Sequence, residues 1–325
     1  MTVLLPPRDR LTIGFAHVAY RMADAFAARG TGIDHFQVGT AAELEARLAD
    51  VDVLVCSFLW KNDYLARSPR LRFLQSISAG TDQYDKPAFA ARGLRLASGQ
   101  GSNEKAVAQH AMALLLALTR HLHLGRDRQA QAQWRPMIGD RTRREDELGG
   151  KTMAIVGFGR IGQRLAAHAK AFEMRVVGVR RDATPMLGVA DAVLPTARLA
   201  EALGQADVVV LTCPLTPETT NLMDAAAFAA LKPGAILINV ARGKVVDEGA
   251  LLAALASGTV SSAGLDCFHD EPLPATSPIW ALPNVLVTPH SAGETRRYED
   301  NVVDLLLENL DRLWAGRTDL VNGIV

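Results

Sequence analysis

Short apolar runs alternate with amphipathic stretches along almost the whole chain. In the first third of the sequence, the apolar runs are of strand length and occupy residues 11–16, 53–56, 73–77 and 94–97. The stretches with helical spacing between them occupy residues 19–28, 41–48 and 86–91. Strands that alternate with helices form βαβ units, so this part is predicted to fold into a parallel sheet covered by helices.

A second alternating series begins after a glycine pair at residues 149–150. Its predicted strands occupy residues 152–156, 175–179, 208–211, 235–240, 262–265 and 285–288, and its predicted helices 161–171, 225–231 and 248–257. A long helix from Asn103 to His121 precedes the series, and the arginine-rich stretch 135–147 predicts an arm on the surface. The last predicted helix, 295–315, has no strand partners, so we expect it to return to the first domain.

Length, charge and cysteine content narrow the class of protein. A chain of 325 residues is long for one core and predicts two α/β domains, residues 1–102 with 294–325, and residues 103–293. Lysine plus arginine number 35, as do aspartate plus glutamate, so nothing indicates a nucleic-acid or membrane partner. Cys56, Cys213 and Cys267 are isolated and lack metal-ligand spacing, as expected of a cytoplasmic protein without a metal site.

A glycine-rich turn follows the first strand of the second series. Gly157, Gly159 and Gly162 have G-x-G-x-x-G spacing between an apolar run and an amphipathic helix. The first glycine permits a tight turn, the second lets the backbone approach a pyrophosphate, and the third lets helix and strand pack closely. The helix that opens with Arg160 and Ile161 would present N–H groups to the phosphates. We therefore expect a doubly wound NAD(P)-binding domain; the alternative is a glycine turn that binds nothing.

The end of the next predicted strand indicates which dinucleotide is preferred. NAD-binding domains commonly place a carboxylate about 20 residues past the first glycine, where it binds the ribose hydroxyl. This chain has Arg180 and Arg181 there, followed by Asp182. Two guanidinium groups can bind a 2′-phosphate through paired hydrogen bonds, so we expect NADP(H) to be preferred over NAD(H). The alternative is a solvated arginine pair, with cofactor choice determined elsewhere.

Three further strand ends each carry one ionisable residue of a different kind. Arg242, Glu271 and His290 follow the last three predicted strands in turn. Loops after the strands of an open parallel sheet form its ligand site. There, an arginine can hold an anionic substrate, a histidine can transfer a proton, and a glutamate can orient that histidine and favour its protonated form. Taken singly, each could instead be a surface cation, a structural histidine or a solvated turn residue.

Several motifs occur together in the order found in one enzyme family. Besides the glycine turn, they are Ser-Ala-Gly-Thr-Asp at 78–82, Ala-Val-Ala-Gln-His at 106–110, Asn-Val-Ala-Arg-Gly at 239–243, Leu-Asp-Cys-Phe at 265–268 with Glu-Pro at 271–272, and Thr-Pro-His-Ser-Ala-Gly at 288–293. On these residues the chain resembles the D-isomer-specific 2-hydroxyacid dehydrogenases, and among them glyoxylate/hydroxypyruvate reductases. Gln109 departs from the family pattern, in which glutamate is more usual. The resemblance implies two Rossmann-like domains, of which the discontinuous one is a flavodoxin-like substrate domain.

The resemblance also implies roles in the reduction of a small 2-oxo acid to its D-2-hydroxy acid. Arg242 would bind the substrate carboxylate and 2-oxo oxygen, and His290, oriented by Glu271, would donate the proton as hydride arrives. Backbone N–H groups of Ala79 and Gly80 would complete the carboxylate site. Phe58, Leu59 and Trp60 follow a predicted strand and are expected in the pocket wall, with core or rim packing as the alternative. Other residues expected around the dinucleotide are Val107, Cys213, Pro214, Val240, Ala241, Asp266, Ala292 and Gly293.

Other interpretations remain open at this point. A D-lactate or phosphoglycerate dehydrogenase would share these motifs, and a dinucleotide-sensing binding protein of the same fold would retain them without turnover. His269 lies near Glu271, but the family pattern gives it no role. Trp134 and the arm after it occupy the region that forms dimer contacts in proteins the chain resembles, so a homodimer is expected.

Overall fold

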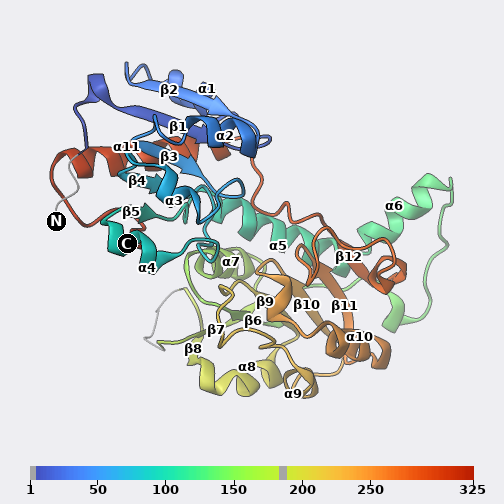
Figure 1. Ribbon diagram of the computed structural model, residues 1–325. Coiled ribbons are helices and arrows are strands. Elements are labelled where there is room, and N and C mark those ends of the chain that lie inside the picture. The colour runs from blue at the N-terminus through green and yellow to red at the C-terminus, as the bar shows by residue number, and fades with distance from the viewer. Residues whose placement is uncertain (1–4, 183–188) are drawn as a thin grey trace. The chain divides into compact units, whose positions relative to one another are not determined.

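The computed structural model describes residues 5–182 and 189–325 and separates the chain into two compact units (Figure 1). Unit 1 consists of Met1–Asn103 and Thr295–Val325, and unit 2 consists of Glu104–Glu294. Each unit has its own parallel sheet and its own apolar core. The predicted fold class, α/β with two parallel sheets, is therefore confirmed.

Unit 1 is built on a five-stranded parallel sheet with the strand order β2-β1-β3-β4-β5. Its strands are β1 (Thr12–Ala16), β2 (Asp34–Val38), β3 (Val53–Cys56), β4 (Phe73–Gln75) and β5 (Arg95–Ala97). Its helices are α1 (Met22–Ala27), α2 (Ala41–Arg47), α3 (Tyr64–Arg67), α4 (Lys86–Arg92) and α11 (Tyr298–Trp314), with a 3-10 turn at Arg8–Arg10. The strand order is that of flavodoxin-like sheets.

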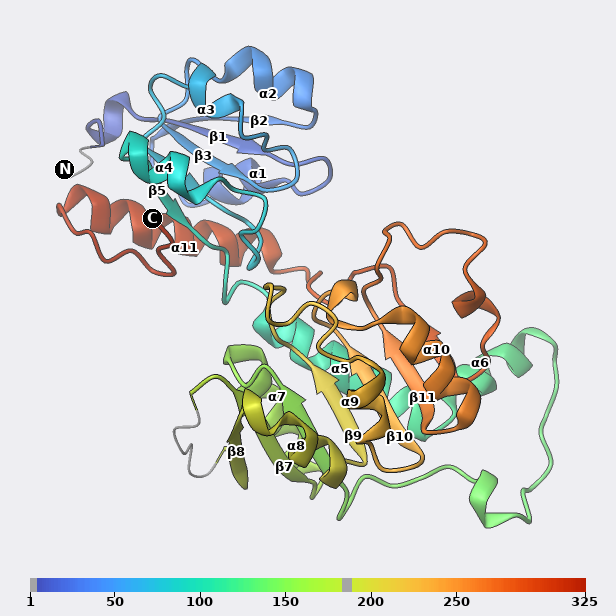
Figure 2. The ribbon, with the colours of Figure 1, turned by 60° about the horizontal axis from the view of Figure 1, so that its bottom comes forward.

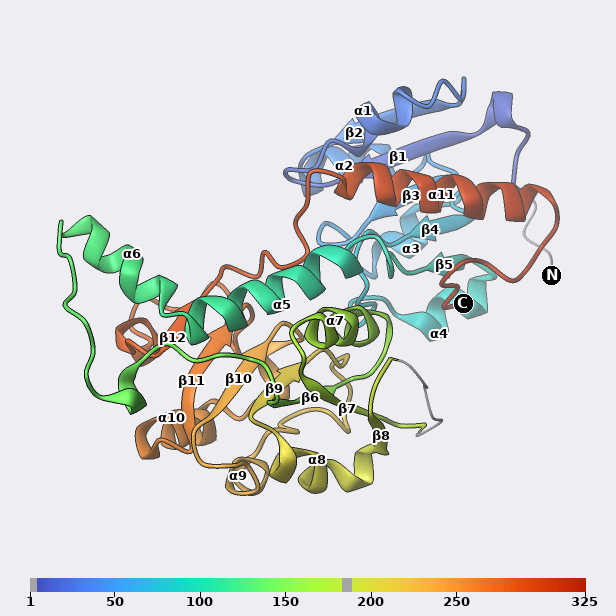
Figure 3. The same cartoon turned by 180° about the vertical axis from the view of Figure 1, so that it is seen from behind.

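Helix α11 packs into the core of unit 1 although it lies far along the chain (Figure 3). Its apolar side, which includes Val302 and Leu306, is fully buried against α1 and the inner strands. Asn309, also fully buried, donates to Gln75 Oε1 on β4 at 2.9 Å and accepts the Val321 N–H at 2.8 Å. These bonds satisfy polar groups that burial would otherwise penalise, and they fix α11 to the sheet.

Unit 2 is built on a seven-stranded parallel sheet with the order β12-β11-β10-β9-β6-β7-β8. Its strands are β6 (Thr152–Val156), β7 (Arg175–Arg180), β8 (Ala192–Pro195), β9 (Val208–Leu211), β10 (Ala235–Asn239), β11 (Val260–Leu265) and β12 (Val285–Val287). Its helices are α5 (Glu104–Thr119), α6 (Leu122–Ala130), α7 (Arg160–Ala171), α8 (Leu199–Gln205), α9 (Ala225–Ala229) and α10 (Glu248–Ser257). Strand order reverses between β6 and β9, and doubly wound sheets bind ligands at this switch point.

Helices cover both faces of the unit 2 sheet, which explains why its inner strands are apolar on both sides. α5 and α7 pack on one face, whereas α8, α9 and α10 pack on the other (Figure 2). Every residue of β6 and of β9 is buried. Strands buried on both faces have continuous apolar runs rather than alternation, and those runs made them predictable.

The helix predicted from Asn103 to His121 is α5, Glu104–Thr119, and a second helix, α6, follows it directly. α5 ends at Thr119, and His121 has a left-handed backbone with φ of 51°, which stops the α-helical path before α6 begins at Leu122. The segment that follows α6 has a single 3-10 turn, Arg141–Arg143, between residues 131 and 147. The arm expected at residues 135–147 thus begins earlier, and from here the arm means residues 131–147. Its Trp134 and Met137 side chains are 97% and 96% exposed.

Within residues 5–182 and 189–325, no helix is both long and apolar enough to cross a membrane. The same residues hold no cluster of three or more histidine, cysteine or acidic side chains arranged to bind a metal ion.

The three cysteines are free and buried. Burial raises the pKa of the Cys213 thiol to about 11 and that of Cys56 to about 12, so neither is a ready nucleophile.

Candidate active site

The three ionisable residues lie on neighbouring strand ends of unit 2. β10, β11 and β12 are adjacent and parallel, so their carboxyl ends meet at one edge of the sheet. Arg242 follows β10, Glu271 follows β11 and His290 follows β12. A backbone hydrogen bond of 2.9 Å from Asp266 N–H to the Asn239 carbonyl extends the pairing of β10 and β11 towards these loops.

Glu271 and His290 are hydrogen-bonded to each other. Nδ1 of His290 lies 2.8 Å from Oε2 of Glu271, and Oε1 of Glu271 accepts the Phe268 N–H at 2.9 Å. Both carboxylate oxygens are thus engaged, which fixes the plane of the carboxylate and, through it, the imidazole ring. The His290 side chain is 41% exposed, and its Nε2 has no hydrogen-bond partner in the described part of the chain. This nitrogen is placed for proton exchange with a ligand.

Arg242 lies on a turn that the buried side chain of Asn239 holds. Asn239, 1% exposed, accepts the Ala241 N–H at 3.0 Å and donates to the Arg242 carbonyl at 3.1 Å. Nη1 of Arg242 donates to the Ala241 carbonyl at 2.8 Å. A Cβ at Gly243 would lie 1.8 Å from the carbonyl carbon of Phe268, so only glycine allows the Arg242 turn to pack on the loop that carries Glu271.

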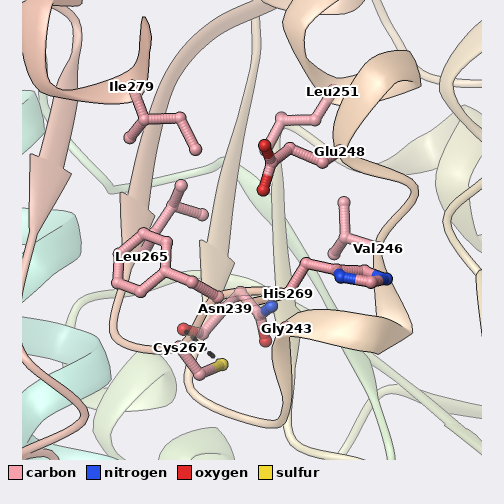
Figure 4. Close-up of a pocket in the computed structure, with 10 residues that line it drawn as sticks. Asn239, Gly243, Val246, Glu248, Leu251, Leu265, Cys267, His269 and Ile279 are labelled. Carbon is pink, nitrogen blue, oxygen red and sulfur yellow. Dashed lines mark hydrogen bonds between the residues drawn. The ribbon is translucent and has the colours of Figure 1, made fainter. Parts of the chain in front are cut away.

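A small cavity adjoins this turn and shows what supports it (Figure 4). Its walls come from the ends of β10 and β11 and from α10, and the lining residues are Asn239, Gly243, Val246, Glu248, Leu251, Leu265, Cys267, Phe268, His269 and Ile279. Arg242, Glu271 and His290 do not line it. His269 lines this cavity, and its Nδ1 lies 3.4 Å from Oδ1 of Asp270. The cavity lies behind the turn that carries Arg242.

Asp266 is the first residue after β11 and is 2% exposed. Its Oδ1 accepts the Thr288 hydroxyl at 2.6 Å and the Ser291 N–H at 2.9 Å, and its Oδ2 accepts the Ala292 N–H at 3.0 Å. The carboxylate thus contacts the loop after β12 on both sides of His290. A carboxylate has about four acceptor positions, so one on Oδ2 is left for a ligand.

The glycine turn lies at the switch point and has the close contacts that its spacing predicts. A Cβ on Gly157, whose φ is 98°, would lie 2.3 Å from the Cys213 nitrogen. A Cβ on Gly162 would lie 2.9 Å from the Gly157 carbonyl oxygen. By contrast, a Cβ built on Gly159 has no atom of the described residues within 4 Å apart from those of Gly159 and its two chain neighbours. The turn is therefore closed on the protein side and open where a pyrophosphate would approach, so the residues present fit a dinucleotide.

The other residues expected around the dinucleotide lie at this edge of unit 2 or beneath it. Val107 on α5, Val240 and Ala292 belong to one buried cluster. Cys213 and Ala241 belong to the cluster on the other face of the sheet. The remaining two, Pro214 and Gly293, each follow one of these buried residues directly.

Arg180 is the last residue of β7, and Arg181 follows it with an exposed side chain. The pKa of the nearby Glu218 carboxyl is lowered, chiefly by a hydrogen bond from the Thr216 hydroxyl and more weakly by the charge of Arg181. The loop after β9 is thus close enough to Arg181 for electrostatic contact. The arginine pair therefore flanks the glycine turn on the neighbouring strand.

In unit 1, Ala79 and Gly80 lie in the loop after β4. Neither N–H group donates to an acceptor in the described part of the chain. Trp60 was expected in the pocket wall, but its side chain is only 6% exposed. It packs on Tyr64 and Phe89 and donates its indole N–H to Asn62 Oδ1 at 3.0 Å. The core alternative describes Trp60 better.

A doubly wound sheet with an open glycine turn and a histidine–glutamate pair at its ligand edge defines a dinucleotide-binding oxidoreductase. The family model described as "D-isomer specific 2-hydroxyacid dehydrogenase, NAD binding domain" matches residues 112–292. The chain therefore belongs to the D-isomer specific 2-hydroxyacid dehydrogenase family, as its motifs predicted, and takes a nicotinamide dinucleotide as cofactor.

The names of similar proteins are consistent with this family. The chain is 36% identical to glyoxylate reductase of Pyrococcus furiosus, over 82% of this chain and 81% of that protein. It is 37% identical to glyoxylate/hydroxypyruvate reductase B of Yersinia enterocolitica, over 76% of each chain. It is also 37% identical to D-3-phosphoglycerate dehydrogenase of Mycobacterium leprae, over 80% of this chain but only 48% of that longer protein.

A solved structure supports the fold over the whole chain. The TT0316 protein from Thermus thermophilus superposes with a TM-score of 0.83 at 33% sequence identity, covering 97% of this chain and 100% of that one. The structural match thus extends beyond the dinucleotide-binding part to unit 1.

Three residues of the site had no role in the sequence interpretation. Asn239 lies in a recognised motif but has no charge, and its hydrogen bonds to the Arg242 turn are visible only in three dimensions. Thr288 and His110 lie in two different motifs that are 178 positions apart, yet Thr288 Oγ1 and His110 Nε2 are 3.0 Å apart. The motif spacing carried no signal for this contact.

Proposed function

We propose that the protein reduces a small 2-oxo acid, such as glyoxylate or hydroxypyruvate, to its D-2-hydroxy acid with NADPH. The observation that carries the proposal is the His290–Glu271 pair at the ends of β12 and β11, next to the end of β10 that carries Arg242, in a dinucleotide-binding unit. Relatives named glyoxylate reductase and glyoxylate/hydroxypyruvate reductase support the substrate class.

In this mechanism the chain binds the anion and moves one proton. The guanidinium of Arg242 binds the substrate carboxylate and 2-oxo oxygen. When bound, the reduced nicotinamide supplies a hydride to the carbonyl carbon. His290 gives the proton on Nε2 to the carbonyl oxygen, so the C=O group becomes H–C–OH, and Glu271 stabilises the charged imidazole beforehand. A proton from solvent restores His290.

The direct test measures NADPH oxidation with a panel of 2-oxo acids, for the unmodified protein and for the His290→Ala variant. We expect turnover of glyoxylate or hydroxypyruvate by the unmodified protein and a fall in kcat of at least about 100-fold in the variant, the usual worth of a positioned acid. Cofactor affinity, measured by fluorescence titration, should change little. Near-normal turnover by His290→Ala would remove the proposed proton donor. No turnover of any 2-oxo acid, with tight NADPH binding, would favour a dinucleotide-sensing role.

The preference for NADPH is proposed from Arg180 and Arg181 at the end of β7. The double change of both arginines to serine should lower kcat/KM for NADPH by about 10-fold or more and leave that for NADH within about threefold, because only NADPH has the 2′-phosphate. Equal efficiency of the unmodified protein with the two cofactors contradicts the preference.

Of the three residues expected in the pocket wall, Phe58, Leu59 and Trp60, we propose that Phe58 contacts the ligand. Phe58 follows β3 and is 80% exposed, so its ring is available to a ligand. A phosphoglycerate or D-lactate type of dehydrogenase is the second candidate, supported by the phosphoglycerate dehydrogenase relative. Pyruvate and 3-phosphohydroxypyruvate in the same panel separate these activities.

We also infer a homodimer in the reducing cytoplasm. The arm, with Trp134 and Met137 almost fully exposed, offers apolar surface that a second copy would cover. Free, buried cysteines suit a reducing compartment. Sedimentation of a monomer at working concentration would contradict the dimer.

A further inference from the structure

The carboxylate of Asp266 holds the loop that carries His290 from both sides. Its Oδ1 accepts two hydrogen bonds. One comes from the Thr288 hydroxyl, at 2.6 Å, which precedes His290 in the sequence, and the other comes from the Ser291 N–H, at 2.9 Å, which follows it. Its Oδ2 accepts a third from the Ala292 N–H at 3.0 Å. Because Asp266 is 2% exposed, water does not compete for these bonds, and each is strong.

The histidine between these contacts has a backbone that needs support. His290 has φ of 53°, in the left-handed region that few residues other than glycine occupy. Its N–H donates to the Thr288 carbonyl at 3.0 Å, which closes a tight turn. A conformation of this kind persists only when neighbouring groups fix it. Asp266 and Thr288 are the groups that do so here.

The chain of hydrogen bonds continues from Thr288 to helix α5. Thr288 has one hydroxyl proton, and it is directed to Oδ1 of Asp266. The Thr288 oxygen must therefore accept from Nε2 of His110, which lies 3.0 Å away. The same nitrogen is 3.6 Å from Oδ1 of Asp266, so its N–H also stabilises the carboxylate. His110 thus carries its proton on Nε2, and its ring orients both Thr288 and Asp266.

We propose that His110 and Thr288 are positioning residues, which act through Asp266 to fix the loop and ring position of His290. The inference rests on the proposed function, because it concerns where the proton donor stands when a 2-oxo acid is reduced. Neither side chain moves a proton in the reaction. They set the distance from His290 Nε2 to the carbonyl oxygen, a quantity to which the rate of proton transfer is steeply sensitive.

The test uses paired changes at position 288. Thr288→Val keeps the shape and removes both hydroxyl bonds, whereas Thr288→Ser keeps the hydroxyl. We expect Thr288→Val to lower kcat by about 10- to 100-fold, as for other residues that orient a catalytic group, with KM for the 2-oxo acid nearly unchanged because Arg242 is untouched. Thr288→Ser should stay within about threefold of the unmodified protein.

A matched control separates positioning from general stability. Thr119 on α5 is 4% exposed and donates its hydroxyl to the Leu115 carbonyl at 3.0 Å, outside this chain of bonds. Thr119→Val removes a buried hydroxyl of the same kind, and we expect a similar change in Tm with no change in kcat. An equal fall in kcat for Thr119→Val, or unchanged kcat for Thr288→Val, overturns the proposal.

Two further measurements give readouts that a structural role alone does not move. If His110 and Thr288 act through one chain of bonds, the double variant His110→Phe with Thr288→Val should be no slower than the slower single variant; additive losses contradict this. The imidazole ¹⁵N signals of His290 in histidine-labelled protein should shift in Thr288→Val but not in Thr119→Val. This readout needs no turnover, so it tests the positioning even if no 2-oxo acid proves to be a substrate; an unshifted His290 signal overturns it.

Discussion

At the scale of single residues, the site depends on polar side chains that touch the reacting groups only through others. Asn239 is one of them. It is buried, and both the oxygen and the nitrogen of its side-chain amide form hydrogen bonds with the turn that carries Arg242. Removing such an amide leaves a buried N–H and a buried carbonyl without partners. The turn would then shift to satisfy these groups, which displaces the Arg242 guanidinium and also lowers the stability of the fold.

We therefore expect Asn239→Ala to raise KM for the 2-oxo acid about 10-fold or more and to lower the free energy of unfolding by about 1–3 kcal/mol. NADPH affinity should be nearly unchanged. Steady-state kinetics and denaturant unfolding measure the two effects. If KM is normal while stability falls, Asn239 supports the fold without placing Arg242.

A second prediction at this scale concerns pH and His17, which lies just after β1 and is 7% exposed. Its Nδ1 accepts the N–H groups of Ala19 and Tyr20 at 3.1 and 2.8 Å. Burial lowers the pKa of His17 below the ordinary 6.5, although Glu299 opposes the shift. The unfolded chain then takes up this proton at a higher pH than the folded chain, so stability is lost as pH falls below about 6.5.

Replacing His17 by asparagine, whose side-chain oxygen can accept the same N–H groups, should reduce the fall in Tm between about pH 7.5 and about pH 5.5. Thermal melts at both pH values test this, with the exposed His269→Asn as the control. A pH dependence equal to that of the unmodified protein shows that other groups cause the loss.

At the scale of elements, the glycine turn between β6 and α7 combines two different demands on one motif. Gly157 is required by the protein itself, since its positive φ and its contact with Cys213 exclude a side chain. Gly159 has open space in front of it and is required only by what binds there. The same residue type thus has a folding role at one position and a binding role two positions later.

Substituting alanine at each position should separate these roles. Gly157→Ala is expected to destabilise the protein by about 1–3 kcal/mol through strain and steric overlap. Gly159→Ala should melt near the normal temperature but bind NADPH at least about 10-fold more weakly, because its methyl group enters the space for the pyrophosphate. Thermal melts and fluorescence titration distinguish the cases, and a Gly159→Ala variant that binds normally would falsify the assignment of this space.

At the scale of the whole molecule, the sequence predicted two parallel sheets because their inner strands are buried on both faces and leave unbroken apolar runs. It did not predict β2, where only Val38 is buried, or β8, where only Leu194 is buried, since neither stood out as an apolar run. The edge strand β12, Val285–Val287, is apolar throughout and was predicted. The ionisable triad could be placed because parallel strands end at one edge. Asn239 and the His110–Thr288 contact could not be predicted, because they depend on side-chain geometry between distant segments.

The arm has a spectroscopic consequence. Of the four tryptophans, Trp60 is buried in unit 1, whereas the Trp134 side chain is 97% exposed. An indole that moves from water into an apolar interface emits at shorter wavelength. Dilution through the dissociation range of a dimer should therefore shift the emission to longer wavelength, and Trp134→Phe should abolish the shift. The arm that suggests a dimer thus carries an intrinsic fluorophore that can report its formation.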